Sequence, residues 1–488
     1  MRFLFSCLLL ALLGGCGPSG PDGPVQVAII GDPGSLTEEG VRLSPAGQHL
    51  RAATIEGLVG LDETGQVIPA LAERWIVTDD GLSYIFRLRN SDWPDGRQIG
   101  ANDVRQSLRE SIRQLRGTSL GLDLGKVSEI RAMTGRVVEI RLTSPMPDFL
   151  RLLAQPELGI ARNDAGAGPM TLAFDEESGV ASLTALPPER RGLPARENWE
   201  DLVRPLILRA LPARAAVEAF RGGEVDLVLN GQIDSLPLAD TGPLSRGAVR
   251  IDGARGLFGL IVRSNDGFLA DPARREALAM SIDRDGLMQP LNIGGWQSST
   301  WVVPVGLFGN SGPQAERWEN LSLQQRREIA RGRVRAWEAA QGKDAVVRIA
   351  MPPGPGSDRL FAQIAGDFGL VGVTAVQAKP GDAADLELFD RLARYESPRW
   401  YLNQLNCGLR VGLCSSEADR LVALSVTETD PVAKAQLLDA ANREIASANV
   451  YIPLGAPVRW SLVRGDISGF EANLWGMHPL FPLVEPTR

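Results

Sequence analysis

Short apolar runs alternate with segments of helical period along most of the chain. Val25–Ile30 and Leu257–Val262 are uninterrupted apolar runs of strand length. Between Trp75 and Leu88, apolar and polar residues alternate on either side of Asp79-Asp80-Gly81, which is the pattern of a β-hairpin with one face buried. This mixture of strands and helices predicts the α/β fold class.

Helix start signals recur in the second half of the chain. Asp271-Pro272 and Asp430-Pro431 each place an N-capping side chain before a proline, which is favoured in the first helical turn. Ser322 and Gln325 form a capping-box pattern ahead of a charged helix that we expect to end near Gln341. Each signal predicts where a helix begins.

Two further patterns lie nearer the N-terminus. Asn102 or Asp103 can cap a helix that runs to about Leu115. Residues 206–228 read as strand, helix and strand, and this spacing is typical of a parallel strand pair. We therefore expect a parallel sheet in part of the fold.

The first residues have the pattern of a secretion signal. Arg2 precedes a short apolar stretch, Phe3–Leu13. This stretch is shorter than a membrane-spanning helix, which needs about 20 apolar residues. Gly14-Gly15-Cys16 resembles the cleavage box of bacterial lipoproteins. We expect removal of residues 1–15, acylation of Cys16 by palmitate, and a flexible Gly- and Pro-rich tether after it. The alternative is an ordinary cleaved signal with an incidental cysteine.

Length and charge narrow the function classes. A chain of 488 residues is too long for one hydrophobic core and suggests two or three domains. The formal net charge of -8 argues against a nucleic-acid partner, which needs a basic surface. No phosphate-binding loop or Ser/His/Asp pattern is readable, and the two histidines, His49 and His478, lie in no catalytic motif. We therefore expect that the protein is not an enzyme and has neither a cofactor nor a metal site.

Two cysteines lie outside the N-terminal segment. Cys407 and Cys414 form an even pair in a chain with an export signal, and an oxidising compartment favours a disulfide between them. Two thiols alone make a poor zinc site, because zinc usually takes four ligands.

A series of motifs keeps one order along the chain. Glu56-Gly57-Leu58-Val59 and residues 69–75 (PALAERW) precede the predicted hairpin, and residues 101–104 (ANDV) follow it. Further on come Gly166-Ala167-Gly168-Pro169 and Gly223-Glu224-Val225-Asp226. In this order the motifs resemble those of the family 5 extracellular solute-binding proteins, which take up oligopeptides, dipeptides and, in some members, nickel. Dipeptide-binding members carry a cysteine pair similar to the one described above.

The resemblance implies a two-lobed periplasmic binding protein fold, with an extra domain inserted in the first lobe and a hinge between the lobes. We expect a signal peptide (1–15), a lipidated tether (16–24), lobe I (25–48, 166–258 and 466–488), domain II (49–165) and lobe III (259–465). The implied function is that of the substrate-binding lipoprotein of an ABC importer, which captures a peptide or peptide-like solute and delivers it to permease subunits driven by an ATPase. We expect a monomer in the periplasm or at the cell surface, attached to the membrane through its N-terminal lipid.

The ligand-binding chemistry departs from the family pattern in residues 385–402. The family commonly carries a Trp and then Asp-Pro here, and dipeptide-binding members pair that Asp with the ligand's α-ammonium. A gapless comparison puts Arg391 at the Trp and Ser397 at the Asp, and a serine cannot neutralise an ammonium. Glu396 could replace the missing charge if it turns toward the cleft. Arg391 and Arg394 instead favour an anionic ligand group held by a guanidinium fork.

The other candidate ligand contacts lie in loops. They are Ser35 and Leu36 after the first strand, Trp301 after a Gly-Gly pair, and Trp400 and Tyr401 after a proline. Two alternatives stay open: a protein that binds a metal-chelate solute, and a surface or sensor lipoprotein that hands nothing to a permease.

Overall fold

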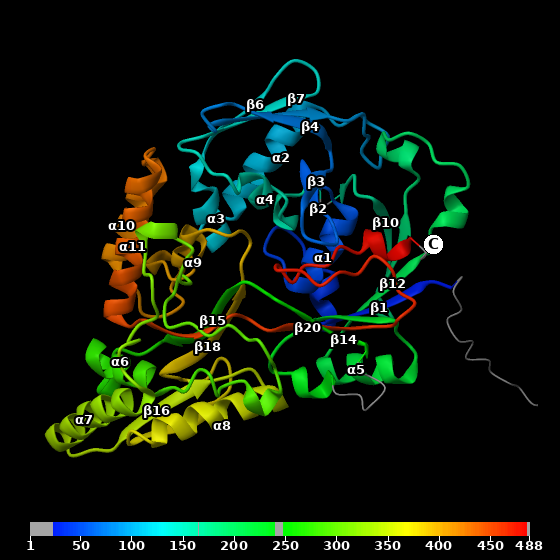
Figure 1. Ribbon diagram of the computed structural model, residues 1–488. Coiled ribbons are helices and arrows are strands. Elements are labelled where there is room, and N and C mark those ends of the chain that lie inside the picture. The colour runs from blue at the N-terminus through cyan, green and yellow to red at the C-terminus, as the bar shows by residue number, and fades with distance from the viewer. Residues whose placement is uncertain (1–22, 164, 240–246, 486–488) are drawn as a thin grey trace, which may run out of the picture.

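The computed structural model describes residues 23–163, 165–239 and 247–485. These residues form a seven-stranded, a five-stranded and a four-stranded sheet, each with helices packed against it. In Figure 1 the four-stranded sheet lies above the other two, which lie side by side along the bottom of the molecule. The predicted α/β class is therefore confirmed.

The seven-stranded sheet forms lobe I. Its strands, in spatial order, are β10 (Met170–Asp175), β11 (Val180–Ala185), β12 (Leu206–Leu211), β1 (Val25–Ile30), β13 (Leu227–Gly231), β20 (Arg459–Val463) and β14 (Val249–Asp252). β1 pairs in parallel with β12 and with β13, and helix α5 (Ala213–Gly222) connects those two neighbours. The predicted strand-helix-strand unit is thus confirmed.

The four-stranded antiparallel sheet forms domain II, which the chain builds between β1 and β10. Its strands, in spatial order, are β4 (Ala72–Val77), β5 (Ser83–Leu88), β7 (Val137–Leu142) and β6 (Val127–Ala132). Helix α2 (Ala101–Gln114) packs against β6 and β7. The smaller elements of this region are α1 (Pro45–Thr54), β2 (Val59–Leu61), β3 (Val67–Pro69), α3 (Ser119–Asp123), α4 (Phe149–Leu153), β8 (Ala161–Arg162) and β9 (Ala165–Gly166). Gly81, with φ +67°, makes the tight turn between β4 and β5, as the hairpin pattern predicts.

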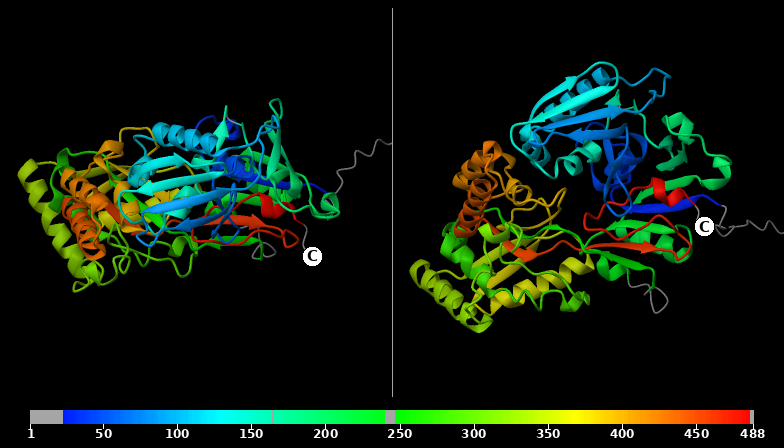
Figure 2. Two further views of the ribbon diagram at one scale, coloured as in Figure 1. Left: turned by 90° about the horizontal axis from the view of Figure 1, so that it is seen from above. Right: turned by 45° about the horizontal axis from the view of Figure 1, so that its top comes forward.

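The five-stranded sheet forms lobe III. Its strands, in spatial order, are β17 (Val373–Ala378), β16 (Ala345–Ala350), β18 (Leu386–Leu392), β15 (Gly256–Val262) and β19 (Tyr451–Gly455). The helices of this lobe are α6 (Pro272–Ser281), α7 (Leu323–Gln341), α8 (Pro355–Gly369), α9 (Pro398–Asn403), α10 (Ser416–Thr427) and α11 (Pro431–Ala448). The two views of Figure 2 place domain II beside both lobes, with α10 and α11 (orange) at its side.

The chain passes between the two lobes twice. Residues 253–255 lead from β14 to β15, and residues 456–458 lead from β19 back to β20. The sequence predicts that residues 259–465 belong to lobe III, whereas β20 pairs with β13 and β14 of lobe I. The apolar residues of β20 do not indicate which sheet the strand joins. Its pairing with β13 and β14 shows that the chain returns to lobe I before β20 begins. The other domain boundaries stay a prediction.

Helix starts follow the predicted signals in most places. Asp271 and Asp430 cap α6 and α11, and Ser322 forms the capping box of α7 with Gln325. Helix α2 differs, because Gly100 is its N-cap and the Asp103 carboxylate accepts a hydrogen bond from the Gly100 N–H at 2.8 Å.

An ion pair ties the end of one crossing segment to lobe III. Arg459, the first residue of β20, donates two hydrogen bonds to the carboxylate of Asp390 in β18, at 2.7 and 2.9 Å. The side chains are only 7% and 10% exposed, so each charge depends on the other for compensation. The pair therefore ties the first residue of β20, beside the second crossing segment, to the sheet of lobe III.

Removal of one partner should be costly. Arg459→Met leaves the Asp390 carboxylate buried without a cation, and we expect the free energy of unfolding to fall by about 3 kcal/mol. Urea unfolding followed by circular dichroism measures this loss. The double variant Arg459→Met/Asp390→Leu is the control, since it removes both charges and should recover most of the stability. A single variant as stable as the unsubstituted protein would contradict this role of the pair.

Candidate functional site

A cavity of about 420 Å³ lies where lobe I, domain II and lobe III meet. We call it the interlobe cavity. Its walls come from the segment around α1, from domain II, from the end of β13, from the start of β20, from the end of β18 with the chain that follows it, and from the C-terminal segment. The lining residues are Leu43, Pro45, Gln48, His49, Leu61, Ser119, Arg151, Gln155, Pro156, Asn230, Gln232, Asp390–Arg394, Trp400, Gln404, Arg459 and Trp475–Met477.

The cavity opens at the carboxyl ends of parallel strands. β1 and β13 end side by side, and the Asn230 amide donates a hydrogen bond of 2.7 Å to the carbonyl oxygen of Ile30. After domain II the chain reaches β12 on one side of β1, and α5 then leads it to β13 on the other side. Ligands of α/β sheets bind at such switch points. Ser35 lines a second cavity of about 480 Å³ at the same edge, which shares Pro45, Asn230 and Gln232 with the interlobe cavity.

Two arginines of the interlobe cavity are neutralised by carboxylates. Arg459 pairs with Asp390, as described above. Arg394 donates two hydrogen bonds to the buried carboxylate of Glu157, at 2.6 and 2.9 Å, and a third of 2.9 Å to Gln155. Arg394 was expected to be a ligand cation, but the structure commits it to Glu157 and so to the contact between lobe III and domain II.

Two other arginines have no carboxylate partner among the described residues. Arg391 is exposed, and its guanidinium lies over the Phe389 ring with 5.1 Å between Cζ and the ring centroid. Arg151 lies over the Trp475 ring at 4.0 Å. Its Nη1 is buried without a hydrogen-bond partner. Burial lowers the pKa of Arg151, although the charges of Asp148, Asp62 and Glu396 oppose that shift. The interlobe cavity therefore carries two guanidinium groups that form no ion pair with a carboxylate of the described residues.

Comparison with known families decides what kind of protein has this architecture. Residues 66–384 match the family described as bacterial extracellular solute-binding proteins, family 5 Middle. The chain belongs to this family. The motif resemblance and the two-lobed fold expected from it are thus confirmed.

Individual relatives of this family 5 protein differ in what their names say they bind. A probable di/tripeptide-binding protein 5 of Pseudomonas aeruginosa is 22% identical over 84% of this chain and 86% of that protein. A probable deoxycholate-binding periplasmic protein of Escherichia coli, YgiS, is 32% identical, but the match covers only 26% of this chain and 27% of the relative.

Solved structures agree in fold across nearly the whole chain. The E. coli murein tripeptide binding protein MppA superposes with a TM-score of 0.79 at 17% identity, over 97% of this chain and 100% of that one. Haemophilus influenzae OppA, in complex with RPPGFSPFR, gives 0.78 at 17% identity, over 96% and 100%. At such identities the likeness concerns the fold alone.

The predicted ligand residues separate into two groups. Arg391 and Trp400 line the interlobe cavity, and Ser35 lines its neighbour. Glu396 and Ser397 line neither cavity. Glu396 pairs with Arg255 in the hinge, and Ser397 is the N-cap of α9. Whether any of these residues touches a solute stays a prediction.

The other three candidates are held by the protein's own packing. Leu36 is 5% exposed in the core of lobe I. The Trp301 indole donates a hydrogen bond of 3.0 Å to the carbonyl of Ala315 within lobe III. Burial raises the pKa of Tyr401 to about 12, and its ring packs edge-on against Trp400 at 5.0 Å. None of the three lines the interlobe cavity.

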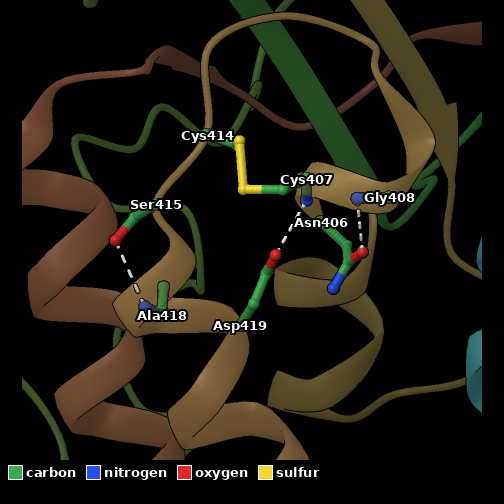
Figure 3. The surroundings of a disulfide bond; sticks show 7 residues. All are labelled: Asn406, Cys407, Gly408, Cys414, Ser415, Ala418 and Asp419. Carbon is green, nitrogen blue, oxygen red and sulfur yellow. Dashed lines mark hydrogen bonds between the residues drawn. A yellow bond between two sulfur atoms is a disulfide. The ribbon is translucent and has the colours of Figure 1, made fainter.

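Cys407 and Cys414 form a disulfide, as the sequence predicts, with 5.2 Å between their Cα atoms. The Cys407 N–H donates to the Asp419 carboxylate at 2.9 Å, as Figure 3 shows, so the loop is also tied to the first turn of α10. Ser415 caps that helix by accepting from the Ala418 N–H at 3.2 Å. The disulfide lies beside the α9–α10 junction and lines neither cavity, which makes it part of the framework of lobe III.

Cys16, the predicted site of lipidation, lies outside the described residues. Within those residues, no helix combines the length and apolarity needed to span a bilayer. In the same ranges no cluster of three or more His, Cys, Asp or Glu side chains could hold a metal ion. Both histidines are buried. The His49 Nδ1 lies 2.6 Å from the Pro45 carbonyl, and burial lowers the pKa of His49 to about 4.

The contact between domain II and lobe III contains a buried carboxylate. Asp123, which is 0% exposed, accepts hydrogen bonds from Tyr395 at 2.8 Å and from Asn403 at 2.7 Å. Arg399 donates to the Asp123 and Leu122 carbonyls at 3.2 and 2.6 Å. These bonds join the end of α3 to α9 and so hold domain II against lobe III.

Sequence reasoning missed several residues of the cavity. Arg151 lies on α4 and Trp475 lies in the C-terminal segment, and neither belongs to a motif. Asn230 carried a usable signal, because an asparagine at the end of an apolar strand tolerates the left-handed backbone that it adopts here, with φ 64°. Trp475 could not be found from sequence, since it approaches the cavity only after the chain has crossed back to lobe I.

The Asp123 carboxylate should make stability depend on pH. Burial raises its pKa from 3.8 to about 6, against the opposing effects of Arg399, Asn403 and Tyr395. A raised pKa means that its contribution to stability is fully present below pH about 4 and is lost as the pH rises through about 6. At 1.36 kcal/mol per pKa unit, the unsubstituted protein should lose about 3 kcal/mol relative to Asp123→Asn between pH 4 and 7.

Urea unfolding of both proteins at several pH values measures this difference. The exposed Asp344→Asn variant controls for the loss of a carboxylate elsewhere. A constant difference between Asp123→Asn and the unsubstituted protein across this range would contradict the assignment.

Proposed function

We propose that this family 5 protein is the periplasmic solute-binding component of an ABC importer, and that it holds a peptide or peptide-like solute in the interlobe cavity. The observation that carries the proposal is a cavity walled by both lobes and by domain II at a strand switch point. Movement of the lobes about the two crossing segments admits the solute and releases it to the permease.

The size and lining of the cavity support this function. Its volume of about 420 Å³ falls within the about 300–1,000 Å³ of small-molecule sites. Gln48, Gln155, Gln232 and Gln404 line it, and amides of this kind supply both donors and acceptors to a solute with a peptide-like backbone. The relatives named for di- and tripeptides agree with a solute of this class.

The chemistry of the site favours binding over turnover. A general base at neutral pH needs a pKa near 7, whereas the His49 imidazole, with a pKa of about 4, stays neutral and hydrogen-bonded to the helix that carries it. His478 lies against Asp252 at 3.1 Å, where it joins the C-terminal segment to the end of β14. Both histidines thus hold segments of backbone together.

Native mass spectrometry of the purified protein tests the proposal. We expect a small molecule bound to one site, released with its mass unchanged. Ser119→Trp should abolish this adduct, because position 119 lines the interlobe cavity. Ser447→Trp, at an exposed position of α11, is the matched control and should retain it. An adduct that survives Ser119→Trp, chemical conversion of the solute, or no adduct together with no thermal shift by a peptide library would each contradict the proposal.

The same proposal includes a lipid anchor on Cys16. The motif Gly14-Gly15-Cys16 supports acylation at this position after cleavage of residues 1–15. In a bacterial host, Cys16→Ser should abolish incorporation of labelled palmitate and move the protein from the membrane fraction to the soluble fraction. Cys7→Ser, within the segment that is removed, is the control and should change neither. Unchanged labelling of Cys16→Ser would show that the anchor is absent or lies elsewhere.

A further inference from the structure

We infer that the solute of the interlobe cavity is an anion with two acidic groups, held between Arg151 and Arg391, and that a free amine is not what the protein recognises. This inference rests on the proposed function and specifies the solute for the same cavity.

The charges that line the cavity do not balance. Arg151, Arg391, Arg394 and Arg459 line it together with one carboxylate, Asp390. Arg459 uses Asp390, and Arg394 uses Glu157 from behind the wall. The other two guanidinium groups have no carboxylate partner among the described residues. A solute with two negative charges would compensate both of them when the lobes enclose it.

Both unpaired guanidinium groups are held against aromatic rings. Arg151 lies over Trp475 and Arg391 lies over Phe389. A ring face attracts the cation but accepts no conventional hydrogen bond, so the stacking leaves N–H groups at the guanidinium edge for an oxyanion. Arg391 uses one of these groups, because its Nη1 donates a long hydrogen bond of 3.5 Å to the Asp390 carbonyl. The two arginines come from domain II and from lobe III, so a solute that binds both also holds the lobes together.

The need for a negatively charged partner is clearest at Arg151. Its Nη1 is buried without a partner, and a buried charged donor left in this state is unfavourable until an acceptor arrives. The Arg151 guanidinium is positioned by the Trp475 ring beneath it. Gly65, with φ +77°, lets the Trp475 ring approach so closely that a Cβ at position 65 would lie 2.5 Å from its Cδ1. The Asn473 side chain accepts a hydrogen bond of 3.0 Å from the Trp475 N–H.

The carboxylates that could hold an ammonium are already used. Asp390 accepts both hydrogen bonds of Arg459, and Glu396 is paired with Arg255 outside the cavity. An ammonium in the cavity would also meet Arg151 and Arg391, whose like charges repel it.

Four synthetic tripeptides test the inference by calorimetry on the purified protein. They are N-acetyl-Ala-Glu-Ala with two carboxylates, N-acetyl-Ala-Gln-Ala with one, its C-terminal amide with none, and Lys-Ala-Ala-amide with two amines. We expect the affinity to fall about tenfold with each carboxylate removed and the amine peptide not to bind. Arg151→Gln and Arg391→Gln should each weaken the dicarboxylate about tenfold and leave the uncharged peptide unchanged. The exposed Arg335→Gln, on α7, is the matched control and should change nothing.

Equal affinity for the charged and uncharged peptides, tight binding of the amine peptide, or arginine variants that bind the dicarboxylate normally would each overturn the inference. The proposed function can still hold in those cases, because a solute is bound. A bound solute that persists in native mass spectra and that no peptide displaces tests the inference through the charge of that solute. A neutral or basic solute overturns the inference. Failure of the proposed function is a different result, namely a protein that carries no solute and responds to none.

Discussion

Two short backbone segments, residues 253–255 and 456–458, carry the chain between lobe I and lobe III, and the Arg459–Asp390 ion pair anchors the second of them. Because Arg459 begins a strand of one lobe and Asp390 lies in a strand of the other, the pair sets how the two sheets face each other. The interlobe cavity exists only in the space that this alignment leaves. The binding chemistry therefore depends on an interaction that itself removes one cation and one carboxylate from use by a solute.

The contact between domain II and lobe III depends on a different set of interactions. Glu157 of domain II binds Arg394 of lobe III. Asp123 accepts hydrogen bonds from Tyr395, which precedes α9, and from Asn403 at the end of α9. One apolar cluster continues across the same contact, from Phe86 and Val104 in domain II to Trp400 in lobe III. Polar bonds specify how the surfaces meet, and the apolar contacts supply most of the favourable free energy.

Short sequence patterns predicted the features that depend only on neighbouring residues, such as the helix caps. The caps at Asp271, Ser322 and Asp430 depend on three or four consecutive residues, so their patterns could be read directly. Motifs in chain order predicted the family and its two-lobed fold. The site was harder, because the charge that matters at Arg394 is cancelled by Glu157, a residue 237 positions away. Arg151 was not predicted either, because only the folded chain brings it to the cavity that Arg391 lines.

The late position of β20 has a consequence for how the chain folds. Val463 of β20 pairs with Leu227 of β13, and β14 joins the lobe I sheet through β20 as its edge strand. The preceding strand, β19, supplies the edge of the lobe III sheet. In a chain that emerges N-terminus first, both sheets thus wait for residues 451–463, and β13 and β15 expose unpaired edges until then. Such edges are sites of aggregation. We therefore expect the nascent protein to depend on a holding chaperone until β19 and β20, which enter different sheets, have both emerged.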